Sequence, residues 1–212
     1  GCMVCDGKYL YAIYKPSGAD FKYIAKFDTA TMVLVTYWDF TVEDFEFDAI
    51  IWTGTQILAS AYRLSTTESL IIGIDSTTGV GTIITTFAAV GPSLPVLQFA
   101  MNQDSVFMVT DEWPEGRIWC YNKSTSAVTY ITYTATLLPA SMATDGTYIY
   151  LGTGGNFTNI TLKKISLDGT TVASKNANTV GELWFLSFDG TNLWAATSIL
   201  GGFSGPANCI RK

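Results

Sequence analysis

Carboxylates are the side chains most able to carry acid–base chemistry in this sequence, because its 212 residues include no histidine. Cleavage of a glycosidic bond needs two carboxyl groups on either side of the bond. Asp48 and Glu182 are the candidates for such a pair, since each lies in or at the edge of a stretch that we predict below to be an inner strand. These two residues define a carbohydrate-active enzyme as one hypothesis for the function.

The other parts of a familiar catalytic site are absent from the sequence. The arginines are Arg63, Arg117 and Arg211, and none lies on a predicted inner strand, so the arginine cluster of a sialidase-like site is not expected. No GxSxG, HExxH or phosphate-binding-loop pattern occurs. A non-enzymatic protein is therefore the leading hypothesis, and the enzyme is the alternative.

Three aromatic residues are candidates for ligand binding: Trp113, Phe157 and Phe203. Each lies in a predicted loop, and the two phenylalanines are surrounded by glycines. One hypothesis is a shallow aromatic platform that stacks on sugar rings. The other interpretation, which we favour, is that each ring fills a gap between neighbouring structural units.

Metal and cofactor sites are not predicted. Five of the 18 acidic residues fall within ten positions, at Asp39, Glu43, Asp44, Glu46 and Asp48, but their spacing matches no dedicated calcium loop. A solvated acidic surface explains them better. Cys2 and Cys5 have CxxC spacing without the further ligands that zinc or haem would need. We expect buried thiols or a disulfide at the four cysteines, Cys2, Cys5, Cys120 and Cys209.

Composition excludes two classes of partner. The formal net charge is −6 with only 12 basic residues, which argues against a nucleic-acid-binding surface. Hydrophobic residues make up 48% of the chain, yet the longest uncharged run, residues 76–103, is interrupted by glycines and prolines. No membrane span is predicted.

A repeated unit organises the whole chain. Residues 142–153 read as a strand, an Asp-Gly turn and a second strand, and residues 186–197 and 3–12 repeat this pattern. Residues 50–60 and 100–109 are degenerate copies. The second turn residue falls at Gly7, Gly54, Asp104, Gly146 and Gly190, at spacings of 47, 50, 42 and 44. A period in this range with several short strands is the signature of a β-propeller.

A second turn follows about 20 residues after the first in each complete repeat. It begins at Asp28, Asp75, Asn122 and Asp168. The sequence therefore predicts an all-β, five-bladed β-propeller of four-stranded antiparallel meanders in a single domain. The approximate blades are residues 1–40, 41–90, 91–134, 135–178 and 179–212. We expect the last blade to be incomplete, either with three strands or as part of a longer protein.

The cores of two repeats, Asp145–Tyr150 and Asp189–Trp194, resemble the YVTN- and NHL-like propeller repeats of bacterial and viral surface proteins. The resemblance implies architecture, and members of this group include binding, scaffolding and enzymatic proteins. Our hypothesis is a structural or recognition module on an extracellular surface, a cell surface or a virion. We expect other protein subunits as partners and consider a glycan as a possible ligand.

Closure of the ring is the least regular feature of the predicted fold. Two ways of fastening blade five are open: a disulfide from Cys209 to Cys2 or Cys5, or pairing of its exposed edge with another chain or with residues absent from this sequence. We favour strand pairing, because an unpaired apolar edge invites aggregation.

Overall fold

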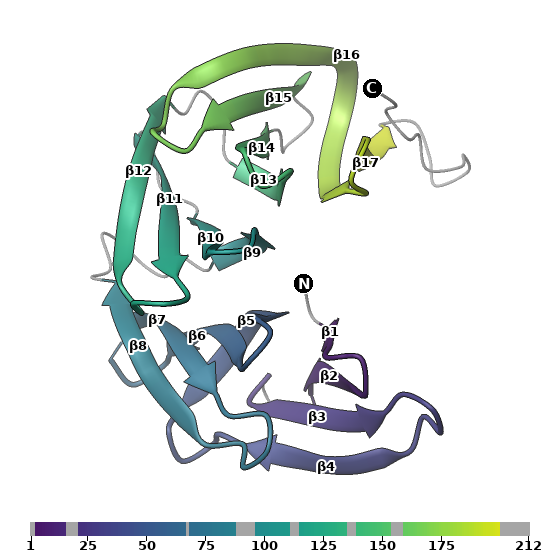
Figure 1. Cartoon of the computed structure of the whole chain (residues 1–212), viewed down its shortest axis with the longest axis vertical. Helices are drawn as coiled ribbons and strands as arrows, with labels where there is room; N and C mark the ends of the chain where they lie inside the picture. The colour runs from purple at the N-terminus through teal and green to yellow at the C-terminus, as the bar shows by residue number, and fades with distance from the viewer. Residues whose placement is uncertain are drawn as a thin grey trace. The chain divides into compact units, whose positions relative to one another are not determined.

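The computed structural model describes residues 3–15, 21–66, 68–87, 96–110, 115–134, 139–153 and 159–199. The described chain consists of antiparallel strands and turns and contains no helix. It divides into two compact units, Gly1–Val96 and Leu97–Lys212. Each unit is described by itself below, and Figure 1 labels the strands.

The first unit contains two four-stranded sheets in which the strands follow one another in chain order. One sheet consists of β1 (Met3–Cys5), β2 (Tyr9–Tyr14), β3 (Tyr23–Asp28) and β4 (Leu34–Asp39). The other consists of β5 (Phe45–Trp52), β6 (Ile57–Arg63), β7 (Glu68–Ile74) and β8 (Gly81–Phe87). Each sheet is the antiparallel meander that the repeats predict.

The second unit begins with a four-stranded sheet of β9 (Val96–Met101), β10 (Ser105–Thr110), β11 (Glu115–Asn122) and β12 (Val128–Thr134). A five-stranded sheet follows, made of β13 (Pro139–Thr144), β14 (Tyr148–Thr153), β15 (Asn159–Ser166), β16 (Thr171–Phe188) and β17 (Leu193–Ile199). Among the described residues the meander of repeats is thus confirmed over three four-stranded sheets and one larger sheet.

Strand β16 differs from the prediction, because it runs across the predicted boundary between the fourth and fifth blades, at residues 178 and 179. It is a single strand of 18 residues. Its first part pairs with β15 as far as Val180, opposite Asn159, and its last part pairs with β17. The register with β15 shifts between Asn176 and Val180, and β16 pairs with strands of two successive repeats. Residues 200–212, the end of the predicted fifth blade, lie outside the described residues.

Asp-Gly turns, with Thr53-Gly54 in the second repeat, connect the first two strands of four repeats. The second turn residues Gly7, Gly54, Gly146 and Gly190 all have positive φ, between 91° and 101°. This conformation strains residues with a Cβ, so glycine is favoured there.

The core of the first unit lies between its two sheets, where β1 and β2 lie against β5. Tyr11 and Ile24 of the first sheet pack with Phe45, Phe47 and Ile50 of the second. Buried residues occur at consecutive positions in β6 and β7, as at Ile57 and Leu58 or Ile71 and Ile72. Strands covered on both faces need not alternate between apolar and polar residues.

Candidate functional site

Asp48 lies at an irregularity in strand β5. The pairing with β6 shifts between Phe47 and Ala49, which makes Asp48 the extra residue of a β-bulge. Solvent reaches the Asp48 side chain, but the surrounding protein is dense enough that burial raises its pKa to about 6, with a further contribution from the charge of Glu46. A carboxyl group with such a pKa can donate a proton near neutral pH.

The bulge itself belongs to the repeat and is not special to Asp48. The pairing of β13 shifts between Pro139 and Ser141, and that of β16 shifts between Leu183 and Phe185. Both irregularities lie six residues before the turn glycine, as Asp48 lies six before Gly54. The backbone geometry is therefore a property of the fold, and only the carboxyl group is particular to β5.

Glu182, the second carboxylate of the enzyme hypothesis, lies on β16 opposite Ser198 of β17. Its backbone is described but its side chain is not. Asp48 belongs to the first compact unit and Glu182 to the second, so their pairing stays a prediction. The aromatic candidates Trp113, Phe157 and Phe203 lie outside the described residues, and their role as a platform also stays a prediction.

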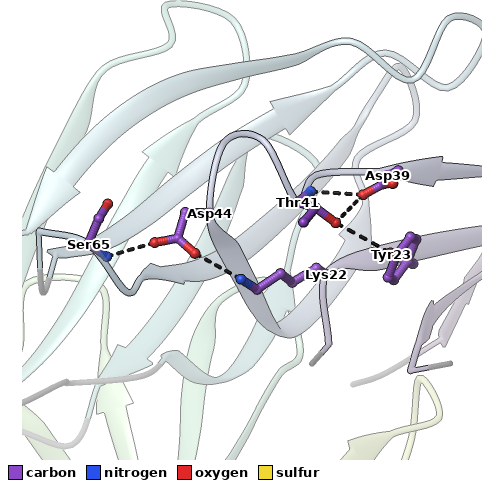
Figure 2. Close-up of polar contacts among 6 residues, drawn as sticks. All are labelled: Lys22, Tyr23, Asp39, Thr41, Asp44 and Ser65. Carbon is purple, nitrogen blue, oxygen red and sulfur yellow. Dashed lines mark hydrogen bonds and ion pairs between the residues drawn. The ribbon is translucent and has the colours of Figure 1, made fainter. Parts of the chain in front are cut away.

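Two residues of the acidic segment, Asp39 and Asp44, hold the loop between β4 and β5 through hydrogen bonds (Figure 2). Asp44, at φ +57°, accepts hydrogen bonds from Lys22 Nζ at 2.8 Å and from the backbone N–H of Ser65 at 2.8 Å. Asp39 accepts bonds from the hydroxyl and the backbone N–H of Thr41. The Lys22 ammonium lowers the pKa of Asp44, and the Thr41 hydroxyl lowers that of Asp39. Both carboxylates thus anchor the loop.

Carboxylates elsewhere in the described chain also hold turns. Six of the described repeat turns carry an Asp whose oxygen accepts backbone N–H groups two and three residues later, or two residues later at Asp168. These are Asx turns, in which the side chain replaces a backbone acceptor. The residues that act in this way are Asp6, Asp28, Asp75, Asp145, Asp168 and Asp189, and the pKa of every one is lowered. Within the described ranges, no group of three or more potential metal-ligating side chains is arranged to hold an ion.

A polar and aromatic clasp connects the two sheets of the first unit. The hydroxyl of Tyr11 donates to Asp6 Oδ2 at 2.8 Å, and the Tyr11 ring is stacked between Trp38 and Trp52 at centroid distances of 5.9 and 6.3 Å. Lys26 Nζ lies 4.1 Å from the Tyr9 ring centroid and donates to the Ser76 carbonyl at 2.8 Å. Trp52 and Ser76 come from the second sheet or its turns, so the clasp joins neighbouring repeats.

The second unit contains an equivalent clasp at the same repeat positions. Tyr150 donates to Asp145 Oδ2 at 2.7 Å, and its ring stacks with Phe188 at 6.1 Å. Lys164 Nζ lies 3.8 Å from the Tyr148 ring centroid. The signal was present in the sequence as an Asp followed five residues later by Tyr or Trp, at Asp6, Asp145 and Asp189. In the degenerate copies, Thr53 and Asn102 are followed instead by Leu58 and Phe107.

A buried hydrogen-bond network in the second unit was not anticipated. Ser141 Oγ donates to Gln98 Oε1, and the backbone N–H of Leu186 donates to Ser141 Oγ at 2.6 Å. The N–H of Met142 also donates to Gln98 Oε1, at 2.9 Å. The network connects β9, β13 and β16, the first strands of three successive repeats.

The cysteines that are described are free thiols. Cys120 is half-buried, and Cys5 is exposed. The expectation of a buried thiol is wrong for Cys5, because its side of β1 faces away from β5. Cys2 and Cys209 lie outside the described residues, so the disulfide hypothesis stays a prediction.

No protein-family model matches the chain, and no curated protein sequence matches it. Solved structures do resemble it. BamB from Moraxella catarrhalis is 16% identical with a TM-score of 0.57, over 92% of this chain and 53% of that one. The Dos1 propeller is 12% identical with a TM-score of 0.54, over 90% and 50%.

Regucalcin from Agrobacterium tumefaciens strain C58, described as a calcium-binding protein, is 11% identical with a TM-score of 0.63, over 93% of this chain and 67% of that one. The chain thus spans about half the length of the first two structures. All three are β-propellers. At these identities the likeness concerns the fold alone, and that fold is a β-propeller.

Proposed function

We propose that the protein is a non-enzymatic structural or recognition module, a single five-bladed propeller domain that binds proteins or glycans within a larger assembly. The observation that carries this proposal is the use of the carboxylates. In a chain without histidine, carboxylates would have to do the acid–base work, and in the described residues most of them cap turns or anchor the loop between β4 and β5.

The lowered pKa values support the same conclusion. A carboxyl group whose charged form is stabilised by several N–H donors stays ionised at neutral pH and is a poor proton donor. The turns that these groups hold are short and regular, which suits a rigid framework that presents a binding surface. We place the module on an extracellular surface, a cell surface or a virion, following the resemblance of its repeats to surface propellers. None of the described residues forms a helix able to span a membrane.

A glycan array tests the glycan-binding form of the proposal. We expect binding that Trp113→Ala, Phe157→Ala or Phe203→Ala weakens, while Tyr130→Ala, an exposed aromatic on β12, serves as the control. Loss of binding in the control alone would contradict the assignment of the platform. If no glycan binds, the protein-binding form remains, and cross-linking in the native assembly should then identify protein neighbours.

The carbohydrate-active enzyme is the second candidate, favoured by one observation, the pKa of about 6 at Asp48. A carboxyl group with that pKa could act as the general acid, with Glu182 as the second carboxylate. Turnover of aryl glycosides that Asp48→Asn and Glu182→Gln both abolish, and that Asp39→Asn leaves intact, would establish the enzyme and overturn the non-enzymatic proposal.

A further inference from the structure

Four turns of the described chain contain an aspartate followed directly by glycine: Asp6-Gly7, Asp145-Gly146, Asp168-Gly169 and Asp189-Gly190. Such a pair can rearrange without an enzyme, because glycine has no Cβ to shield its backbone nitrogen. The nitrogen loses its proton and attacks Cγ of the aspartate, a carboxyl oxygen leaves as water, and a succinimide ring forms. Water then adds to the former α-carbonyl and opens the ring. The product is isoaspartate, in which the backbone runs through the side chain, and the net change is an isomerisation.

Three of these carboxylates are held at both oxygens. In each, Oδ1 accepts two backbone N–H groups of the turn, and Oδ2 accepts a donor on an aromatic ring five residues later. All nine hydrogen bonds are between 2.6 and 2.9 Å long, and the pairs are Asp6 with Tyr11, Asp145 with Tyr150, and Asp189 with Trp194. Since Cγ must rotate toward the glycine nitrogen, these bonds have to break before the succinimide can form.

Asp168 lies in a turn of a different kind, between β15 and β16, and it lacks the ring donor. The residue five positions later is Ala173. Oδ1 of Asp168 accepts a hydrogen bond from the Ser166 hydroxyl and one from the N–H of Thr170 at 2.9 Å. Its side chain is exposed. Because its partners all lie within two residues on either side, local opening of the turn is enough to release this carboxyl group.

The attacking nitrogens do not separate the sites in the same way. The N–H of Gly169 donates to the Ser166 carbonyl at 2.9 Å, and that of Gly146 donates to Thr144 Oγ1 at 3.1 Å. Both nitrogens are therefore restrained by a bond within the turn. The hold on the carboxyl group decides between them.

We propose that Asp168-Gly169 is the site at which the folded chain converts to isoaspartate, while the ring donors protect Asp6, Asp145 and Asp189. The turn is packed closely, since a Cβ on Gly169 would lie 2.7 Å from the Thr132 carbonyl oxygen of β12. Isoaspartate adds one carbon to the backbone at this point, so the turn cannot keep its place against β12. The change loosens the start of β16, the strand that pairs with two successive repeats. This inference is independent of the proposed function, because it concerns the chain itself and no partner.

Peptide mapping of the 212-residue chain tests the proposal. The chain is incubated near neutral pH, folded and in parallel in concentrated urea, and is then digested. Isoaspartyl peptides have unchanged mass, separate from their aspartyl forms by reversed-phase chromatography, and are methylated by an isoaspartyl methyltransferase. In the folded chain we expect isoaspartate to form at Asp168 at least about fivefold faster than at the other three sites, a factor that one further hydrogen bond to a carboxylate can supply. In urea the four rates should converge, because the turns are lost. Asp168→Glu should remove the signal, since glutamate would have to close a larger ring.

Tyr150→Phe tests the protection at a second site. It removes the hydroxyl that donates to Asp145, so isoaspartate at Asp145 should form at least about threefold faster in the folded chain. The rates at Asp6 and Asp189 should stay unchanged, which separates this effect from a general loss of stability. Tyr148→Phe is the matched control and should leave the rate at Asp145 unchanged. Equal rates at all four sites of the folded chain would overturn the proposal, as would a rate at Asp168 below the others. An unchanged rate at Asp145 in Tyr150→Phe would overturn the role of the ring donors.

Discussion

The hydroxyl of Tyr150 donates a hydrogen bond to Oδ2 of Asp145 at 2.7 Å, across the turn that joins β13 to β14. The other carboxylate oxygen of Asp145 accepts the N–H groups of Thr147 and Tyr148. One side chain therefore fixes the turn and also orients the ring that stacks on Phe188. Burial and the Asp145 bond raise the pKa of Tyr150 to about 12, so the phenol remains protonated as the donor.

Removal of this hydroxyl should destabilise the protein by about 1 kcal/mol, the usual net value of a hydrogen bond, with somewhat more for a charged acceptor. We expect Tyr150→Phe to lower the free energy of unfolding by that amount, seen as a lower urea midpoint with an unchanged slope. Tyr148→Phe is the control, because it removes a hydroxyl from the same strand and keeps the ring that Lys164 approaches. Equal losses in both variants would contradict the role of the Asp145 bond.

The turn aspartates make the fold sensitive to acid. Hydrogen bonds from the backbone of Asn192, from Trp194 Nε1 and from the backbone of Thr191 lower the pKa of Asp189 to about 2, from an ordinary value of 3.8. A lowered folded-state pKa contributes stability that is present above pH 3.8 and is lost as the pH falls toward 2. We expect the melting temperature to fall across this window. Asp189→Asn should reduce that fall while lowering stability at pH 7, and an unchanged acid profile would contradict the assignment.

Much of the fold could be predicted from the sequence because turns are local. The Asp-Gly turns and the Asx turns at Asp28, Asp75 and Asn122 depend on residues a few positions apart, and the structure confirms them. The bulge at Asp48 depends on the register with β6, which no short pattern encodes. The Gln98–Ser141 pair depends on how successive sheets are stacked, and residues 43 positions apart give no local signal. The candidate site residues in loops, Trp113, Phe157 and Phe203, lie outside the described residues and remain predictions.

Asp48 should respond to pH in the sense opposite to the turn aspartates. Its folded-state pKa of about 6 exceeds the ordinary 3.8, so its ionisation destabilises the fold as the pH rises from about 4 to 6. Asp48→Asn should therefore raise the melting temperature at pH 7 by a few degrees at most, since solvent screens an exposed group. At pH 3.5 the same substitution should have almost no effect.

Asp39→Asn is the comparison for this measurement. The pKa of Asp39 is lowered by the Thr41 hydroxyl and backbone N–H, so its replacement should destabilise at pH 7. Thermal unfolding at pH 7 and pH 3.5, followed by circular dichroism, gives the sign of the change in melting temperature for each variant. If Asp48→Asn also destabilises at pH 7, the charged form of Asp48 has a favourable partner, and burial does not raise its pKa.

The Ser141 hydroxyl should be among the costliest polar groups to remove. It is fully buried, donates to Gln98 and accepts the N–H of Leu186, so Ser141→Ala leaves that N–H without its acceptor in an apolar setting. A buried polar group left unsatisfied costs about 1–3 kcal/mol. Ser187, at the next position on β16, is half-buried, and Ser187→Ala should change stability by no more than about 0.5 kcal/mol.

Because Gln98 and Ser141 share one network, the effects of Gln98→Leu and Ser141→Ala should not add in the double variant. Urea unfolding of the four chains gives this coupling, and strict additivity would show that the two side chains act independently.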